Sequence, residues 1–243
     1  MKKTKSIGSK NLYESSELEH LRDLLSDFSV PRKLTPEEAL RLSHIQYRLI
    51  SKEVFADLLE VLKAYKKEFP AFFFGQAIIF HLAIFNGIFS NAGEFRKPTD
   101  SQGGLVHFGP FDRKSGKSAK FQGSSPKDIE RDLKEICQLL SPDDPDPALS
   151  AVRFYQRFVY IHPFYDANGR IGRLLVSLYL GYHGYTVLWK PLEEEKKDKF
   201  ISLLNKCHDL MRKPHYEKKV QQLYRFLKKY IISNEELASD IFE

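Results

Sequence analysis

Cysteine and methionine are scarce in this chain of 243 residues, with two of each, and there is a single tryptophan. The two cysteines, Cys137 and Cys207, stand alone on segments with helical periodicity, and neither forms a CxxC pair. This spacing counts against a disulfide framework and against a cysteine-based zinc site.

No apolar run has the length and purity of a membrane span. The most apolar stretch, 71–89, is interrupted by Gln76, His81 and Asn86, so it predicts a buried central helix instead. Within it, we expect His81 to be a hydrogen-bonded core histidine and not a ligand. The start of the chain lacks the apolar core of a signal peptide, and residues 1–11 are predicted to be a disordered basic tail. We therefore expect a cytoplasmic protein without a membrane partner.

Neither charge sign dominates any long segment. The formal net charge is +6, but acidic and basic residues alternate along most predicted helices, so nucleic acid is not an expected partner. With 42% hydrophobic and 29% charged residues, the composition is that of an ordinary globular chain. The length fits one domain with a helical extension.

The most informative stretch is 161–173, which reads IHPFYDANGRIGR. Apolar residues recur at helical spacing on both sides of it. They are Val152, Tyr155, Phe158 and Val159 before the loop, and Ile171, Leu174, Leu175 and Leu178 after it. The first predicted helix, about 149–161, is ended by Pro163, because the residue before a proline is excluded from the helical region. The second begins near Asn168 or Gly169, so a short loop leads into a helix N-terminus.

This loop gathers the groups that phosphate chemistry needs. A helix N-terminus presents free N–H groups and a partial positive charge, and Asn168 adds an amide donor. Arg170 and Arg173 supply guanidinium forks suited to phosphate oxygens. Asp166 is a carboxylate ligand of the kind that Mg²⁺ uses when it bridges phosphates. His162, with a reference pKa near 6.5, is suited to taking a proton from a hydroxyl.

The motif resembles the signature of the Fic family, His-Pro-Phe-x-Asp/Glu-Gly-Asn-Gly-Arg-x-x-Arg. The matching residues are His162, Pro163, Phe164, Asp166, Asn168, Gly169, Arg170 and Arg173. The resemblance implies an all-α, Fic-like helical domain with a short β-hairpin flap over the active loop. It also implies a protein adenylyltransferase that moves AMP from ATP to a Ser, Thr or Tyr hydroxyl.

Roles of individual residues follow from the same resemblance. His162 would be the general base, Asp166 would hold Mg²⁺, and Phe164 would be a buried anchor of the loop. Asn168 and the adjacent N–H groups would hold the α-phosphate, and Arg170 and Arg173 would hold the outer phosphates. The nucleotide-binding residues that the resemblance implies are Asp166, Ala167, Asn168, Gly169, Arg170, Gly172, Arg173, Val106, His107, Phe200 and His208.

Ala167 departs from the family signature, which has glycine at this position. Doc-like toxins of a nearby branch share the alanine and act as kinases, but they carry a lysine where this chain has Gly169. We read Gly169 as favouring AMP transfer, because a glycine lets the nucleotide approach the backbone closely. A Doc-like kinase and removal of AMP by the same site remain alternatives. A third alternative, of another class, is a helical module that only binds phosphate or nucleic acid.

A first helix, predicted over 12–28, carries a second resemblance to the family. Ser15 and Glu19 match the Ser/Thr-x-x-x-Glu-Gly/Asn pattern of Fic inhibitory helices, although His20 replaces the last residue. The resemblance implies that Glu19 pairs with Arg173 and blocks the γ-phosphate site. The alternative is a capping box formed by Ser16 and Glu19.

The rest of the chain is assigned more coarsely. Gly93 and Arg96 resemble the Gly-x-x-Arg that precedes the flap in Fic proteins, and the β-prone run 105–108 predicts a flap strand. The resemblance implies that a target protein docks on Leu105–Phe108 by strand addition; the chain itself could be a target, and a homodimer is allowed. The basic loop 112–124 fits either target docking or a mobile loop. Further helices are predicted near 36–50, 52–67, 71–90, 125–140, 193–211 and 214–232. We divide the chain into a catalytic domain, 29–213, and a C-terminal helical extension, 214–243.

Overall fold

The computed structural model describes residues 25, 34–110 and 119–237. Ser15 and Glu19 of the predicted inhibitory helix lie outside the described residues, as do residues 111–118 of the basic loop.

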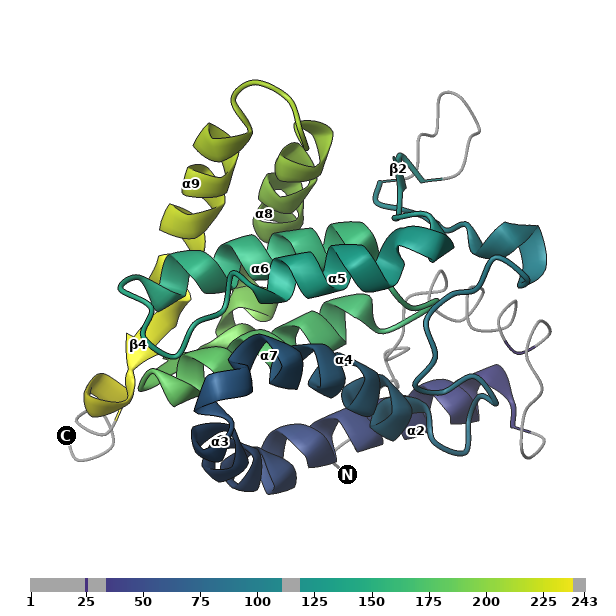
Figure 1. Cartoon of the computed structure of the whole chain (residues 1–243), viewed down its shortest axis with the longest axis horizontal. Helices are drawn as coiled ribbons and strands as arrows, with labels where there is room; N and C mark the ends of the chain where they lie inside the picture. The colour runs from purple at the N-terminus through teal and green to yellow at the C-terminus, as the bar shows by residue number, and fades with distance from the viewer. Residues whose placement is uncertain (1–24, 26–33, 111–118, 238–243) are drawn as a thin grey trace, which may run out of the picture.

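Two helices form the centre of the molecule and carry the loop between them (Figure 1). Helix α6, Pro147–Ile161, and helix α7, Asn168–Tyr182, run side by side, and α5, Ile129–Cys137, packs along α6. Proline at the first position and Asp146, whose side chain accepts from the N–H of Leu149 at 3.1 Å, start α6. The predicted boundaries of both helices around the loop are confirmed.

The N-terminal half of the described chain covers the other side of α7. Helix α2, Pro36–Leu49, begins with the capping box expected of its sequence, in which Thr35 and Glu38 bond each other's backbone N–H groups. The prediction of one regular helix over 52–67 is wrong. A π-helical turn, Ile50–Val54, precedes α3, Phe55–Ala64, and a 3₁₀ turn, Lys66–Glu68, follows it.

Helix α4, Phe69–Phe85, is the predicted central helix, with its start and end each a few residues earlier than expected. The span Lys66–Phe85 is long and apolar enough to cross a membrane by length and composition, with a mean hydropathy of 1.5. In this fold α4 packs against α2, α5 and α7, and its fully buried Phe73 lies edge-on to Tyr179 of α7. Its aromatic side chains therefore form the core behind the loop.

A short hairpin stands over the start of the loop. Strand β1, His107–Phe108, pairs antiparallel with β2, Phe121–Gln122, with Phe108 opposite Phe121. The predicted flap strand is thus confirmed in its last two residues. A 3₁₀ turn, Pro126–Asp128, then leads into α5.

The C-terminal region is bound into the same core. Helices α8, Trp189–Asp209, and α9, Tyr216–Leu227, form a hairpin that packs on α6, and Val220, Leu223 and Leu227 of α9 are buried. The prediction that the last helix continues to residue 232 is wrong, because α9 ends at Leu227. After a 3₁₀ turn, Lys228–Tyr230, strand β4, Ile231–Ser233, pairs antiparallel with β3, Tyr185–Val187. These β-branched and aromatic residues favour strand pairing over helix, so the chain after α9 pairs with β3 instead of extending the helix.

Candidate active site

The backbone of His162 fixes where its ring lies. His162 ends α6 in the left-handed conformation (φ 54°, ψ 59°), and its N–H donates to the Phe158 carbonyl at 3.1 Å. Its ring stacks on Phe108 of the flap, with centroids 4.6 Å apart and planes 14° apart. Nδ1 lies 3.3 Å from the Val159 carbonyl oxygen, which favours the tautomer with the proton on Nδ1. Nε2 is then the nitrogen that can accept a proton.

Arg96 joins the loop to both ends of the flap. Its side chain is 1% exposed, and its Nε donates to the His162 carbonyl at 2.7 Å. Nη2 donates to the carbonyls of Ser124 and Ile161 at 2.8 and 3.3 Å, and Nη1 donates to that of Gly104. Burial lowers the pKa of Arg96 to about 10. The motif Gly-x-x-Arg marked this arginine in the sequence, but its carbonyl partners, three of them remote in sequence, are seen only in the fold.

The turn of the loop is closed on itself by Asn168. Its Oδ1 accepts from the Phe164 N–H at 3.0 Å, and its Nδ2 donates to the Phe164 carbonyl at 2.8 Å. The side-chain amide that we expected to contact phosphate is therefore engaged by Phe164. Phosphate contact through the N–H groups of the first turn of α7 remains a prediction, because those groups have no acceptor within the helix.

Phe164 anchors the loop in the core, as predicted. Its ring is fully buried and stacks on His81, with centroids 4.1 Å apart and planes 7° apart. His81 Nδ1 accepts the Gly93 N–H at 2.8 Å, and burial lowers the pKa of His81 to about 3. The prediction of a hydrogen-bonded core histidine is confirmed.

Ala167 occupies a conformation that glycine adopts more readily. It precedes α7 with φ 59°, in the left-handed region where a Cβ is disfavoured. The preceding carboxylate, Asp166, accepts the Ala167 N–H and lies 3.8 Å from Nη2 of Arg170. This explains physically why the signature has glycine here, and it shows that alanine is accommodated.

Asp166 suits a nucleotide-bound Mg²⁺ better than a protein-only metal site. Among the described residues, no three or more His, Cys, Asp or Glu side chains are placed to hold a metal ion together. Mg²⁺ commonly uses one or two carboxylates and completes its shell with phosphate oxygens and water. The part-buried carboxylate of Asp166 fits that role, with the remaining ligands coming from a nucleotide.

The two arginines of the motif are held by different partners. Nη1 of Arg170 donates to Ser43 Oγ of α2 at 3.0 Å, and its guanidinium lies 5.7 Å from the ring centroid of Phe85. Arg173 is 18% exposed in its side chain, and its Nη1 forms an ion pair with Glu193 of α8. Nε of Arg173 is buried with no hydrogen-bond partner among the described residues. Neither Ser43 nor Glu193 carried a signal in the sequence, since both come from elements remote from the motif.

Charges of both signs meet around these side chains. His44, which follows Ser43 in α2, has its pKa lowered to about 4, first by burial and then by the charge of Arg170. The neutral imidazole adds no charge, so Arg170 and Arg173 face the carboxylates of Asp166 and Glu193. An anion that displaces Glu193 would find the guanidinium fork of Arg173.

These groups surround one cavity of about 400 Å³. It is lined by His107, Phe108, His162, Tyr165, Asp166, Ala167, Asn168, Gly169, Arg170 and Arg173. Most of the predicted site residues therefore meet in one place, beneath the flap. Phe108, expected only as part of the target-docking strand, also lines the cavity. Tyr165 was not predicted as a site residue, and it is fixed by its hydroxyl, which donates to Asp100 at 2.8 Å.

Four residues predicted to bind the nucleotide do not line this cavity. Gly172 faces α6, where a Cβ would lie 3.1 Å from the ring of Tyr155, so its role is close helix packing. Phe200 is buried against Tyr155 and Trp189. His208 is buried behind the flap, with its pKa lowered to about 4 by burial. A fourth residue, Val106, is also absent from the lining, and its carbonyl accepts from the Gly123 N–H at 3.1 Å.

Comparison with known proteins finds a family match around the loop. Residues 74–180 match the model of the Fic/DOC family. A stretch of 101 residues, 42% of this chain, is 32% identical to the ribonucleoside-diphosphate reductase small chain of Ostreid herpesvirus 1 (isolate France) and covers 17% of it. A stretch of 77 residues, 30% of this chain, is 32% identical to protein adenylyltransferase fic-1 of Caenorhabditis elegans and covers 15% of it. The chain thus spans about one sixth of either curated relative.

Among solved structures, the chain is similar to the N-terminal Fic domain of a VirB-translocated Bep effector protein from Bartonella quintana with bound ADP. The TM-score is 0.56, the sequence identity is 14%, and the match covers 88% of this chain and 96% of that one. This likeness shows the all-α fold alone.

Proposed function

Since the chain carries a Fic domain, we propose that it is a protein adenylyltransferase that moves AMP from ATP to a Ser, Thr or Tyr hydroxyl of a protein. One observation carries the proposal. The cavity places a general base, His162, together with a helix N-terminus and two arginines under one flap. The adenylyltransferase activity of the Caenorhabditis elegans relative and the ADP bound to the Bartonella quintana neighbour agree with it.

The geometry suggests how the chain's own residues would act. Nε2 of His162 takes the proton of the target hydroxyl as the hydroxyl oxygen attacks the α-phosphorus of ATP. The bond between the α-phosphorus and the oxygen that bridges it to the β-phosphorus breaks, and pyrophosphate leaves. The N–H groups at the start of α7 stabilise charge on the α-phosphate, while Arg170 and Arg173 hold the outer phosphates. Mg²⁺ at Asp166, when bound, would neutralise phosphate charge. Catalysis would rest on positioning and charge, as in other phosphoryl transfers.

A module that only binds phosphate or nucleic acid explains the site less well. Such a module needs cations and N–H donors but has no use for a carboxylate among them. Asp166 lies within the arginine cluster, and His162 is held against the flap in the tautomer that makes Nε2 the proton acceptor. Both features are expected of an enzyme site.

The second candidate function is transfer of the γ-phosphate of ATP, with the nucleotide bound in the reverse direction, as in Doc-like kinases. Ala167 favours it, because the alanine is shared with that branch. Gly169 opposes it, since this position lines the cavity without a side chain where the branch has lysine. The two reactions move different phosphorus atoms of ATP.

Label transfer distinguishes them. The full chain, incubated with Mg²⁺ and a mixture of acceptor proteins, should become labelled or should label an acceptor from α-labelled ATP and not from γ-labelled ATP. Transfer of the γ-label alone would establish the kinase reaction instead. His162→Ala should abolish transfer from either label while nucleotide binding persists, because general-base catalysis contributes about 10²–10⁴-fold. A variant that keeps more than about a tenth of the rate would remove His162 from this role.

Partners and location remain part of the proposal. ATP is the co-substrate, an extended target segment pairs with the flap near Leu105–Phe108, and the chain itself is a candidate acceptor. A cytoplasmic location, where ATP is abundant, is consistent with these roles.

A further inference from the structure

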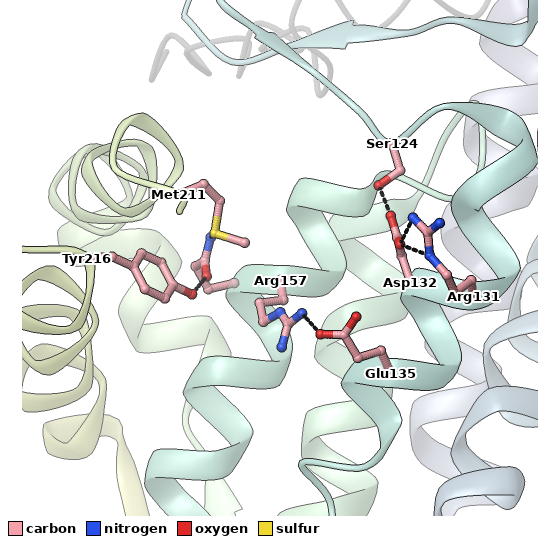
Figure 2. Close-up of polar contacts among 8 residues, drawn as sticks. Ser124, Arg131, Asp132, Glu135, Arg157, Met211 and Tyr216 are labelled. Carbon is pink, nitrogen blue, oxygen red and sulfur yellow. Dashed lines mark hydrogen bonds and ion pairs between the residues drawn. The ribbon is translucent and has the colours of Figure 1, made fainter. Parts of the chain in front are cut away.

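A second cavity, of about 300 Å³, lies beside the catalytic one. It is bounded by α5, α6 and the connection between α8 and α9, as Figure 2 shows. Its lining residues are Ser124, Asp132, Glu135, Arg157, Tyr160, Ile161, Met211, Arg212 and Tyr216. None of them contributes to the proposed transfer of AMP.

The wall between the two cavities is thin. Ile161 lines the second cavity and the next residue, His162, lines the first. On the flap side, Ser124 lines the second cavity, and its N–H donates to the Ile161 carbonyl at 3.0 Å. A Cβ on Gly123 would lie only 3.0 Å from His162 Cβ. A polypeptide whose hydroxyl reaches His162 can therefore place a neighbouring side chain in the second cavity, since an extended chain advances about 3.3 Å per residue.

The acidic side chains of this cavity are already satisfied. Asp132 accepts from Ser124 Oγ at 2.7 Å and from Nε and Nη2 of Arg131 at 3.1 and 2.8 Å. Glu135 accepts from Nη2 of Arg157 at 2.6 Å. Figure 2 shows both pairs along α5 and α6. A basic ligand group would have to displace these donors before it could bind.

The basic side chains of this cavity have hydrogen-bond donors left for an anion. Arg212, at the exposed rim, forms no ion pair within the described part of the chain. Arg157 uses Nη2 for Glu135, and a guanidinium has five donors in all. The planar forks of both arginines suit a carboxylate. Between them, Met211, Tyr160 and the ring of Tyr216, whose hydroxyl donates to Gln156, provide apolar surface for a short aliphatic stem.

We propose that this second cavity is a specificity subsite that takes an Asp or Glu side chain of the target polypeptide, within about four residues of the modified hydroxyl. The proposal rests on the proposed function, because it names the class of substrate for the same site. Arg212 and Arg157 recognise the carboxylate, and the rings hold its methylene groups. The formal charge of +6 on the whole chain would assist the approach of an acidic partner.

The test is a peptide-binding experiment that does not require catalysis. A degenerate library with a fixed central Ser, Thr or Tyr, and randomised flanking positions, is bound to the immobilised full chain, and the retained peptides are sequenced. Asp and Glu should be enriched at one flanking position. Arg212→Glu should abolish this enrichment or convert it to Lys and Arg at the same position, lowering affinity for the preferred acidic peptide by about tenfold, the loss of one charge-assisted contact.

Lys213→Glu is the matched control, because it makes the same change of charge at the adjacent exposed residue, which does not line the cavity. It should keep the acidic preference. A library without charge preference at any position, or a preference that Arg212→Glu leaves unchanged, would overturn the subsite. Equal effects of the two variants would show that the acidic preference comes from general attraction by the basic surface, and this would also overturn the subsite. Since binding is read without transfer, a failure of AMP transfer in the labelling assay is distinguishable from a failure of this subsite.

Discussion

The guanidinium of Arg173 is held by the carboxylate of Glu193, which approaches it from the start of α8. In the proposed reaction the same guanidinium binds an outer phosphate of ATP. A carboxylate and a phosphate oxygen compete for one fork, so Glu193 disfavours nucleotide binding until it is displaced. The Glu193 side chain is 43% exposed, and exposed pairs contribute about 0–1 kcal/mol. The effect on nucleotide affinity should therefore be modest.

Glu193→Gln should strengthen ATP binding. Removing the competing charge is expected to lower the Kd for ATP by up to about fivefold, which corresponds to roughly 1 kcal/mol. Isothermal titration calorimetry with ATP and Mg²⁺ measures it directly. Glu194→Gln is the control, because Glu194 is on the same helix but pairs with Lys190 at 3.9 Å, away from the motif. If both variants bind ATP like the parent, the pair with Glu193 has no part in nucleotide binding.

Glu19→Gly tests the stronger inhibition that the N-terminal motif predicts. If the form competent for ATP is about 1% populated, closure is worth roughly 2.7 kcal/mol, and removing Glu19 should raise transfer by up to about a hundredfold. Glu17→Gly, two residues away, should change little. A variant that only loses thermal stability would support the capping-box alternative, in which Ser16 and Glu19 start a helix.

The double variant Glu19→Gly/Glu193→Gln shows whether the two glutamates act on one fork. If both glutamates compete for Arg173, their effects on ATP binding are coupled. The effect of the double variant on the free energy of ATP binding should then differ from the sum of the two single effects by more than about 0.5 kcal/mol. Strict additivity would mean that Glu19 acts elsewhere. This result is informative because Arg173 already has a carboxylate partner in the described part of the chain.

Local chemistry made the loop predictable from sequence. Pro163 ends α6 and the apolar period restarts after Asn168, so both helix boundaries follow from rules that act over a few residues. The same applies to the capping box at Thr35 and to the burial of Phe164 and His81. The gathering of the motif's charged groups in one cavity follows from their closeness in sequence.

Tertiary pairing was not predictable in this way. Glu193 reaches Arg173, and Ser43 reaches Arg170, only because α8 and α2 pack beside α7. Strand β4 forms because β3 offers it an edge, which overrides the helical period that precedes it. Phe200 is buried in the core against Tyr155 and Trp189, which its place in the sequence did not indicate. Each of these contacts depends on how elements remote in sequence pack together, which no short-range pattern encodes.

Arg96→Lys should destabilise the fold and loosen the loop. Lysine keeps the charge but cannot reach the four carbonyls that Arg96 bonds at the loop and at both ends of the flap. Buried carbonyls left without a donor cost about 1–3 kcal/mol each, so we expect a loss of about 2–4 kcal/mol in the free energy of unfolding, measured with urea. Arg131→Lys is the control, because Arg131 is an exposed surface arginine with ion pairs to Asp128 and Asp132. Equal, small losses for both variants would show that Arg96 is not the link between loop and flap.

Acid should destabilise the domain through its buried histidines. Burial lowers the pKa of His81 to about 3 and that of His208 to about 4, whereas the unfolded value is 6.5 for both. The unfolded chain therefore binds more protons than the folded one below pH 6.5. Their contribution to stability is present in full above that pH and is lost as the pH falls toward the folded values. Between pH 7 and 5, each histidine should remove about 2 kcal/mol, because the change of stability with pH approaches 1.36 kcal/mol per pH unit below the unfolded pKa of 6.5.

His81→Asn isolates this effect. Asparagine can still accept the Gly93 N–H that His81 Nδ1 accepts at 2.8 Å, but it takes up no proton. The variant should be less stable than the parent at pH 7, because its smaller side chain loses the stacking on Phe164. The difference should shrink by about 2 kcal/mol when urea unfolding is repeated at pH 5, since only the parent pays the cost of keeping His81 neutral. His215→Asn, at an exposed position in the left-handed region that asparagine tolerates, should leave the difference between the two pH values unchanged. Parallel loss of stability in the parent and in His81→Asn would show that His81 takes no part in the acid response.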